Sequence, residues 1–332
     1  MKLDGSYGEG GGQILRTAVA LSAVTGKPVE IESIRKARPK PGLAAQHVKA
    51  VESAAALCGA DVRGCSLRST SLSFIPGKIR AGTFDIDIGT AGSITLLLQC
   101  LMPAAMHAPG AVRLKITGGT DVLWSPSFDY LRYVALFALS RMGYRCDIHL
   151  AHRGYYPEGK GHVEATINPS ELKTVSFDNN TCAAIEGISH SSGLPSHVVE
   201  RQASSAEKIL TQEGYDTRIS REIKDERSTG SGITLWCGTA GGSAPGKRGL
   251  RAEKVGSIAA GLLISELRSG AGVDIYLADQ LIPYIALAGG SFTARTITPH
   301  TRTNIWVTEQ FLDVKFNIEE LETGLFRVSL QP

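Results

Sequence analysis

The sequence predicts an α+β protein built from three repeats of a two-helix, four-stranded unit, with a smaller α/β domain inserted in the third repeat. Helix-like and strand-like runs occur twice in the same order, with equivalent positions about 82 to 85 residues apart. Residues 273–298 start this pattern again, and the stretch before them is more polar and rich in turns. Three pairs of equivalent positions define this spacing. They are the chain breaks at Lys27-Pro28 and Pro109-Gly110, the helix starts near Pro41 and Pro126, and the helix ends at Gly59 and Gly143.

The first unit begins with an apolar helix. Apolar residues recur at helical spacing over Gln13–Val24, and a strand is expected over residues 29–34. A second helix over Leu43–Cys58 is predicted to end at Gly59, because glycine is favoured just past a helix end. Two β-rich runs, 69–74 and 83–88, are expected to close this unit.

The second and third units follow the same order. The second has a helix over residues 91–106, a strand over 112–117 and a second helix over 125–144. The third starts with a helix-like run over 277–287, a break at Gly289-Gly290 and a strand over 291–298. No second long helix is predicted in the third unit, and His300 is expected in a loop after its strand.

The insert is predicted over residues 176–270, which leaves 1–175 and 271–332 as one large domain. We expect helices over 196–213 and 252–269, with a β-rich segment over 217–237 between them. The glycine-rich stretch 239–249 is interpreted as turns.

Composition limits the class of protein. The chain has 332 residues, which suits two or three domains, and its 42% hydrophobic and 20% charged content is typical of a folded globular protein. A net charge of +3 allows a nucleic-acid ligand without requiring one. The N-terminus has no apolar signal core, and the apolar run at 96–106 is too short to span a bilayer, so we expect a cytoplasmic protein without a membrane partner.

The six cysteines are scattered and form no CxxC pair. This spacing argues against a zinc site and favours reduced, mostly buried thiols. They are Cys58, Cys65, Cys100, Cys146, Cys182 and Cys237.

Two N-terminal segments could bind phosphates. GEGGGQILR lets the backbone approach a ligand closely and offers Glu9 and Arg16 to a metal or a phosphate, although a plain tight turn explains it equally well. It is neither a P-loop nor a dinucleotide fingerprint. The stretch RKARPKPG places four cations within six residues, followed by Gln46 and His47, and the alternative is a solvated basic surface.

A further group of polar residues surrounds His300. Tyr276, Asp279 and Gln280 open a predicted helix, whose first N–H groups suit a ligand. A histidine after a strand and facing such a helix start is well placed for chemistry, although a lone loop histidine is often a bystander. Gln99 could present its amide to a base or be a satisfied buried side chain.

Together these segments resemble the RNA 3′-terminal phosphate cyclase family, from one end of the chain to the other and least in the insert. The resemblance implies that each unit is similar to the C-terminal domain of translation initiation factor three, and that the insert is similar to thioredoxin in its elements. The matching segments are DGSYGEGGGQILR (4–16), IRKARPKPGLAAQH (34–47), GTAGSITLLLQ (89–99), ITGGTD (116–121), RGYYPEGKG (153–161), YLADQLIPYIALAGG (276–290) and PHTRTNI (299–305).

The resemblance also implies an activity: ATP-dependent conversion of an RNA 3′-phosphate into a 2′,3′-cyclic phosphodiester, through a covalent histidine–AMP and an RNA-adenylate. His300 matches the nucleophile, and Glu9 would help bind a divalent cation, Mg or Mn. The adenosine pocket would comprise Gln99, Pro126, Tyr276, Asp279 and Gln280. The ATP or RNA phosphates would be held by Arg16, Arg35, Arg38, Gln46 and His47. A homodimer is possible, and the sequence does not distinguish it from a monomer.

Two other functions compete with this one. A cyclase-like RNA-binding or ribosome-assembly factor would keep the fold without catalysis, and an enolpyruvyl transferase would share the repeated units without a covalent histidine. The presence of His300 together with Arg35 and Arg38 argues against the inert factor, since such relatives lack the nucleophile.

Overall fold

Three of the four sheets in this computed structural model, which describes residues 1–331, have the same strand order. In each, the first strand is parallel to the second, and the fourth lies antiparallel between the second and the third. The mixed α+β class is therefore confirmed. The first unit comprises β1 (Lys2–Asp4), α1 (Gly12–Thr25), β2 (Val29–Glu32), α2 (Ala45–Cys58), β3 (Asp61–Arg63) and β4 (Leu72–Ile75).

The second unit contains a broken helix where one continuous helix was predicted. Between α4 and α5 the chain forms a single π-helical segment, η1, which changes the hydrogen-bond pattern of the helix locally. The unit comprises β5 (Gly82–Asp87), α3 (Ile94–Ala105), β6 (Val112–Gly118), α4 (Phe128–Tyr130), η1 (Leu131–Ala135), α5 (Leu136–Arg141), β7 (Arg145–His152) and β8 (Gly161–Asn168).

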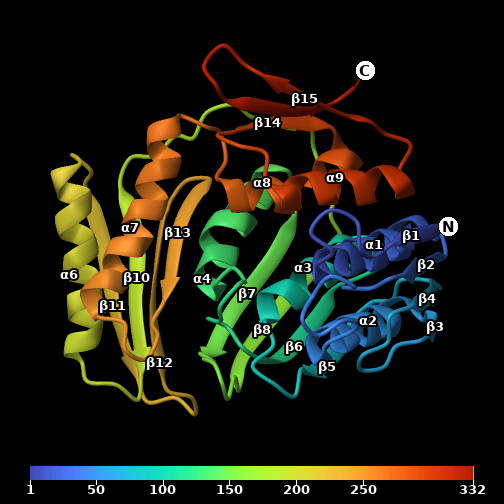
Figure 1. Cartoon of the computed structure of the whole chain (residues 1–332), viewed down its shortest axis with the longest axis horizontal. Helices are drawn as coiled ribbons and strands as arrows, with labels where there is room; N and C mark the ends of the chain where they lie inside the picture. Colours follow the sequence, from blue (N-terminus) through green and yellow to red (C-terminus); the bar gives the residue numbers. More distant parts are fainter. Residues whose placement is uncertain (332) are drawn as a thin grey trace.

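The third unit is interrupted after its first strand. It comprises β9 (Val175–Phe177), α8 (Ile275–Ala288), β14 (Gly290–Ala294), α9 (Pro299–Phe311), β15 (Phe316–Glu320) and β16 (Phe326–Leu330). The interrupting segment, which we call the insert, comprises β10 (Ile185–Ser192), α6 (His197–Gln212), β11 (Thr217–Lys224), β12 (Gly230–Cys237), β13 (Ala240–Pro245) and α7 (Ala252–Ser269). Figure 1 shows the insert at one end of the molecule and the first unit at the other.

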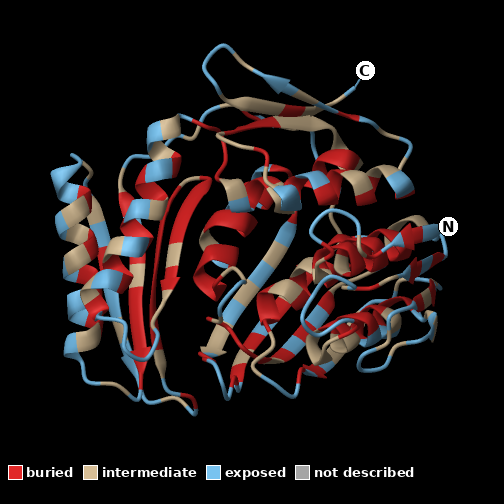
Figure 2. Cartoon of the chain, in the orientation of Figure 1, coloured by how far each residue is buried: buried red, intermediate tan, exposed pale blue. Residues whose placement is uncertain are grey.

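Two apolar cores hold the chain together. The larger core joins the helices of the three units, where α1 packs against α3 and α9, and α8 packs against α9. The insert has its own core, formed where α6 and α7 cover its sheet, with Leu210, Ile233 and Leu263 fully or almost fully buried. Figure 2 shows that buried residues face inward on the helices of the units, whereas much of α6 is exposed.

Several predicted boundaries were wrong. The run at 83–88 does not close the first unit, because β5 pairs with β6 in the second sheet. The insert starts later than residue 176, because β9 pairs with β14 in the third sheet. The stretch 239–249 contains a strand, β13, in place of turns only. The third unit does have a second helix, α9, so His300 lies in a helix and not in a loop.

The expectation for the cysteines also needs correction. Cys182 and Cys237 form a disulfide, because the segment before β10 lies beside the end of β12, with their Cα atoms 5.3 Å apart. The four other cysteines are free thiols, and Cys58 and Cys100 are buried. Over residues 1–331, no helix is both long and apolar enough to span a membrane.

Candidate active site

His300 lies in the first turn of α9. The Thr298 hydroxyl accepts a hydrogen bond from the N–H of Thr301 (3.1 Å), and Pro299 occupies the first helical position, which are two standard signals for a helix start. This local chemistry fixes where the helix begins and therefore where the imidazole projects.

The glycine-rich N-terminal loop supplies the partner of this histidine. The Nδ1 atom of His300 lies 2.5 Å from the Oε2 atom of Glu9, and their side chains are 51% and 38% exposed. The contact between Glu9 and Nδ1 orients the ring, so Nε2 is the nitrogen that remains available to a ligand. The structure therefore presents an accessible imidazole that a carboxylate holds on one side.

Three side chains that the sequence analysis did not single out hold the surroundings of His300 in place. Gln13 on α1 donates from Nε2 to the backbone carbonyl of His300 (2.9 Å) and to Oδ2 of Asp279 (3.4 Å). Asn304 on α9 donates to the carbonyl of Asp279 (2.8 Å) and accepts from the Thr17 hydroxyl (2.7 Å). Gln13 and Asn304 lie within or next to the segments GEGGGQILR and PHTRTNI, and Asn304 is one helical turn after His300, which is the signal that could have identified them.

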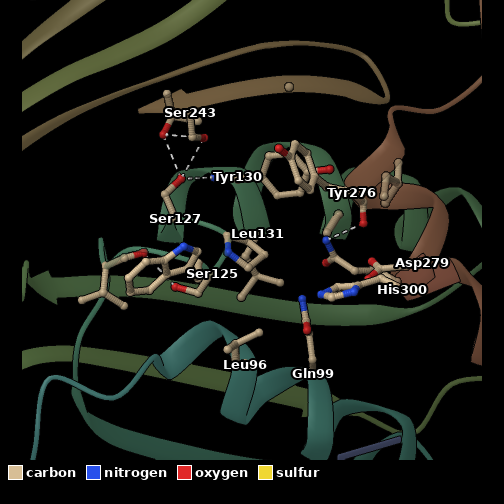
Figure 3. Close-up of a pocket in the computed structure, with 18 of the residues that line it drawn as sticks. Leu96, Gln99, Ser125, Ser127, Tyr130, Leu131, Ser243, Tyr276, Asp279 and His300 are labelled. Carbon is tan, nitrogen blue, oxygen red and sulfur yellow. Dashed lines mark hydrogen bonds between the residues drawn. The ribbon is translucent and has the colours of Figure 1, made fainter. Parts of the chain in front are cut away.

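A cavity of about 470 Å³ opens beside His300. Its walls come from α1, α3, α8, α9, the segment before α4, and the strands β12 and β13 of the insert. Figure 3 shows Gln99 projecting from α3 toward His300, with Tyr276 and Asp279 on the neighbouring α8. The structure brings most of the predicted nucleotide-binding residues to this cavity: Arg16, Gln99, Pro126, Tyr276, Asp279, Gln280 and His300.

Local contacts position the predicted base-binding residues. The Thr95 hydroxyl donates to the carbonyl of Pro126 (2.7 Å), which ties the segment before α4 to α3. The Tyr276 ring is 47% exposed and meets the buried Tyr130 ring edge-on, with centroids 6.5 Å apart. Gln280 donates to the carbonyl of Tyr276 (2.9 Å). An exposed aromatic face beside amide groups is a suitable surface for a purine base.

Two buried carboxyl groups sit at α8. Burial raises the pKa of Asp279 to about 7, although the nearby Arg16 opposes this shift. Burial likewise raises the pKa of Asp274 to about 7, against hydrogen bonds that favour its charged form. Asp274 caps α8 by accepting from two N–H groups, and it also accepts from the Tyr130 hydroxyl and from the N–H of Gly241 on β13. This carboxyl group links α8, α4 and the insert.

Four of the five predicted phosphate-binding residues, Arg35, Arg38, Gln46 and His47, are not among the residues that line the cavity. His47 is buried, and its Nδ1 accepts from the N–H of Ala44 (3.1 Å). Its Nε2 faces Gly12, where a Cβ atom would clash with the ring. Burial, together with Arg16 and Arg35, lowers the pKa of His47 to about 3. This histidine is therefore neutral at the start of α1 and cannot act there as a cation.

The remaining residues of this group differ in how far their side chains are already occupied by contacts within the protein. Arg35 donates to the carbonyls of Gly42 (2.7 Å) and Lys40 (3.1 Å), so part of its guanidinium shapes its own loop. Gln46 accepts from the N–H of Ser93 (3.4 Å) beside the start of α3. The Arg38 guanidinium reaches the start of α1, because a Cβ atom added at Gly11 would lie 3.4 Å from its Nη2.

A second buried polar cluster lies at the insert end of the same cavity, which Asp121 and His190 line. Arg153 contacts Asp121 (3.2 Å), Asp129 (2.9 Å) and Glu222 (2.7 Å), and His190 contacts Asp121 (3.3 Å). Burial opposes ionisation of Asp121, but His190 and Arg153 outweigh it and lower its pKa, whereas burial raises the pKa of Asp129. Asp121, Asp129 and His190 could together hold a metal ion, but Arg153 already forms ion pairs with both carboxylates.

Known proteins resemble this chain over nearly its whole length. A family model described as RNA 3′-terminal phosphate cyclase matches residues 7–318. Relatives named RNA 3′-terminal phosphate cyclase include those of Methanococcoides burtonii, 57% identical over 330 residues, and Methanosarcina barkeri, 57% identical over 331 residues, each with 99% of both chains covered. The relative from Pyrococcus furiosus is 47% identical over 325 residues, covering 96% of this chain and 94% of its own length.

Proposed function

We propose that this chain, which belongs to the RNA 3′-terminal phosphate cyclase family of enzymes, converts an RNA 3′-terminal phosphate into a 2′,3′-cyclic phosphodiester at the expense of ATP. The observation that carries the proposal is the accessible imidazole of His300, held by Glu9 at the edge of a cavity of nucleotide size. A phosphate monoester is a poor electrophile, so a reaction at the RNA end first needs a better leaving group on its phosphorus.

The first step forms a covalent bond between histidine and AMP. Nε2 of neutral His300 attacks the α-phosphorus of ATP, a P–N bond forms, and the P–O bond to pyrophosphate breaks. Glu9 accepts the hydrogen bond from Nδ1–H and stabilises the positive charge that develops on the ring. The contacts of Gln13 and Asn304 keep α9 and α8 in place during this attack.

The nucleoside occupies the cavity during this step. Tyr276 offers its exposed ring to the adenine, and Gln99, Gln280 and Pro126 complete the pocket. Arg16, which lines the same cavity, neutralises phosphate charge. Glu9 would also offer its carboxylate to a divalent cation, which would offset charge on the triphosphate.

Two further transfers complete the reaction. An oxygen of the RNA 3′-phosphate attacks the phosphorus of AMP, and the P–N bond breaks to restore neutral His300. The vicinal 2′-OH then attacks the activated terminal phosphate, its proton passes to solvent, and AMP leaves with the bonding electrons. Because this hydroxyl is held beside the phosphate by the ribose, its effective concentration is high.

The test is a cyclisation assay with an oligoribonucleotide that carries a 3′-phosphate. With ATP and Mg²⁺ or Mn²⁺, we expect an end that resists phosphatase, with one AMP and one pyrophosphate released for each end converted. Cyclisation that proceeds equally without ATP, or no cyclisation with either metal, would overturn the proposed function. The inert RNA-binding alternative would give the second result.

A further inference from the structure

Two loops of the first unit form one rigid surface beside the active site. The backbone N–H of Ile34 donates to Thr70 (2.9 Å), that of Leu43 to Ser69 (3.0 Å), and that of Arg68 back to Leu43 (2.9 Å). These bonds join the loop at 33–43 to the loop at 64–71. We call this surface the basic double loop, and its cations are Arg35, Lys36, Arg38, Lys40 and Arg68.

These five cations have no carboxylate within ion-pair distance among residues 1–331. Some exposed arginines elsewhere are paired, such as Arg201 with Glu253 and Arg221 with Glu207. Arg38 and Arg68 lie close enough to Arg35 to lower its pKa, in addition to the larger effect of burial. The basic double loop therefore concentrates positive charge without a direct ion pair to a carboxylate among residues 1–331, which favours a polyanionic ligand.

The backbone of this surface is also strained. Ser33 (φ 54°), Arg35 (φ 54°) and Arg68 (φ 68°) make up three of the five non-glycine residues with positive φ among residues 1–331. Such conformations suit glycine and cost free energy for other residues, and they concentrate at functional sites. Arg68 in particular occupies a backbone conformation that glycine would adopt without strain.

The cations differ in their distance from the chemistry. Arg38 reaches the start of α1 at Gly11, next to the residues that line the cavity. Lys36, Lys40 and Arg68 are exposed, as Arg38 is, and belong to the same surface. The triphosphate of ATP is short and must place its α-phosphorus at His300, whereas an RNA strand extends outward with one phosphate per nucleotide.

We propose that Arg68 binds the internucleotide phosphate that precedes the terminal 3′-phosphate of the RNA, so that the enzyme selects a strand over a mononucleotide. This inference rests on the proposed function and adds a second phosphate site to it. Arg35 and Arg38 bind the terminal phosphate. Arg68, assisted by Lys36, binds the strand one nucleotide further from the active site.

The experiment pairs a protein change with a substrate change. Arg68→Gly removes the guanidinium and relieves the positive φ, so the variant should fold. The substrate is a 3′-phosphorylated oligoribonucleotide, or the same strand with a neutral methylphosphonate at the linkage before the terminal nucleotide. The control is Arg63→Ala, which removes an exposed arginine of the same unit that faces Asp61 at 3.9 Å.

We expect Arg68→Gly and the methylphosphonate each to raise the KM for the strand about 5- to 10-fold, and their combination to raise it no further. The salt dependence of strand binding should become shallower by about 0.7 in logarithmic slope for the lost contact. Arg63→Ala should behave like the wild type, and labelling of the protein by ATP alone should be unchanged in both variants.

Independent, multiplied effects of the two changes would overturn the inference, because Arg68 would then act on another group. Loss of ATP labelling in Arg68→Gly would also overturn it, because the arginine would then serve ATP. If the wild type takes no label, the proposed function fails. In that case the Arg68 contact is tested by strand binding, measured by fluorescence anisotropy. Weaker binding of the strand by Arg68→Gly than by the wild type would support the contact, and equal binding would overturn it.

Discussion

At the scale of single residues, two histidines near α1 have opposite surroundings. His300 is half exposed and contacts Glu9, whereas His47 is buried against Gly12. Both residues lie in segments that the sequence analysis singled out, but a sequence does not show which ring faces solvent. The difference supports the proposed chemical role of His300, and burial favours the uncharged form of His47.

Glu9→Gln tests the role of the carboxylate that holds His300. The amide keeps an acceptor for Nδ1–H but cannot neutralise the charge that develops on the ring. We expect protein adenylylation to slow by about 10- to 100-fold, measured by quenched-flow labelling with ATP. Glu30→Gln, which alters an exposed carboxylate beside Lys2, should label at the wild-type rate. An unchanged rate in Glu9→Gln would show that the carboxylate is dispensable.

His47 predicts a defined dependence of stability on pH. Its folded pKa of about 3 lies below the unfolded value of about 6.5, so only the unfolded chain takes up a proton between these values. The free energy of unfolding should therefore fall as the pH drops from 6.5 toward 3, by at most about 1.4 kcal/mol per pH unit. In urea titrations, His47→Gln should lose this part of the slope. Equal slopes for both proteins would contradict the buried neutral state.

At the scale of elements, the apolar periodicity predicted most helices closely, including α7 at 252–269. It missed α9, although Thr298 and Pro299 carry helix-start signals, because the residues after them are polar for a full turn. It also missed β13, since glycines usually mark turns. The strand carries a glycine at position 242 because the backbone of α7 at Ala259 leaves no room for a Cβ atom. This is a constraint of tertiary packing, which a sequence does not show.

Asp274→Ala tests what fixes α8. The substitution leaves the N–H groups of Tyr276, Leu277 and Gly241 without their acceptor, and the last two are buried. We expect a loss of about 2–4 kcal/mol in the free energy of unfolding, from urea denaturation. Asp61→Ala, at an exposed aspartate of β3, should change it little. A loss as small as that of Asp61→Ala would mean that Asp274 does not organise α8.

At the scale of the whole molecule, the site is assembled from parts far apart in the chain. Glu9 comes from the first unit, Gln99 from the second, His300 from the third, and β12 and β13 of the insert complete the cavity. Repeat spacing does not show which loops meet, because the packing of α1 against α3 and α9 decides that. Resemblance to a family suggested these residues, and packing explains their proximity.

Arg153→Met tests the contact between the insert and the second unit. The variant leaves Asp121 and Asp129 buried without their cation, and it also breaks the pair with Glu222 of the insert. We expect the free energy of unfolding to fall by about 3–5 kcal/mol in urea denaturation. Arg201→Met, which breaks an exposed ion pair within the insert, should have little effect. If Arg153→Met were as stable as the wild type, the ion pairs of Arg153 would not hold the insert against the second unit.

The central claim is that His300 carries AMP, and covalent labelling tests it most directly. The protein is incubated with α-labelled ATP and a divalent cation, then separated under denaturing conditions and treated with acid. We predict an acid-labile label on the wild type, absent from His300→Ala, and discharged onto a 3′-phosphorylated oligoribonucleotide. Equal labelling of His300→Ala and the wild type, or no label on the wild type at any metal or pH, would contradict the claim.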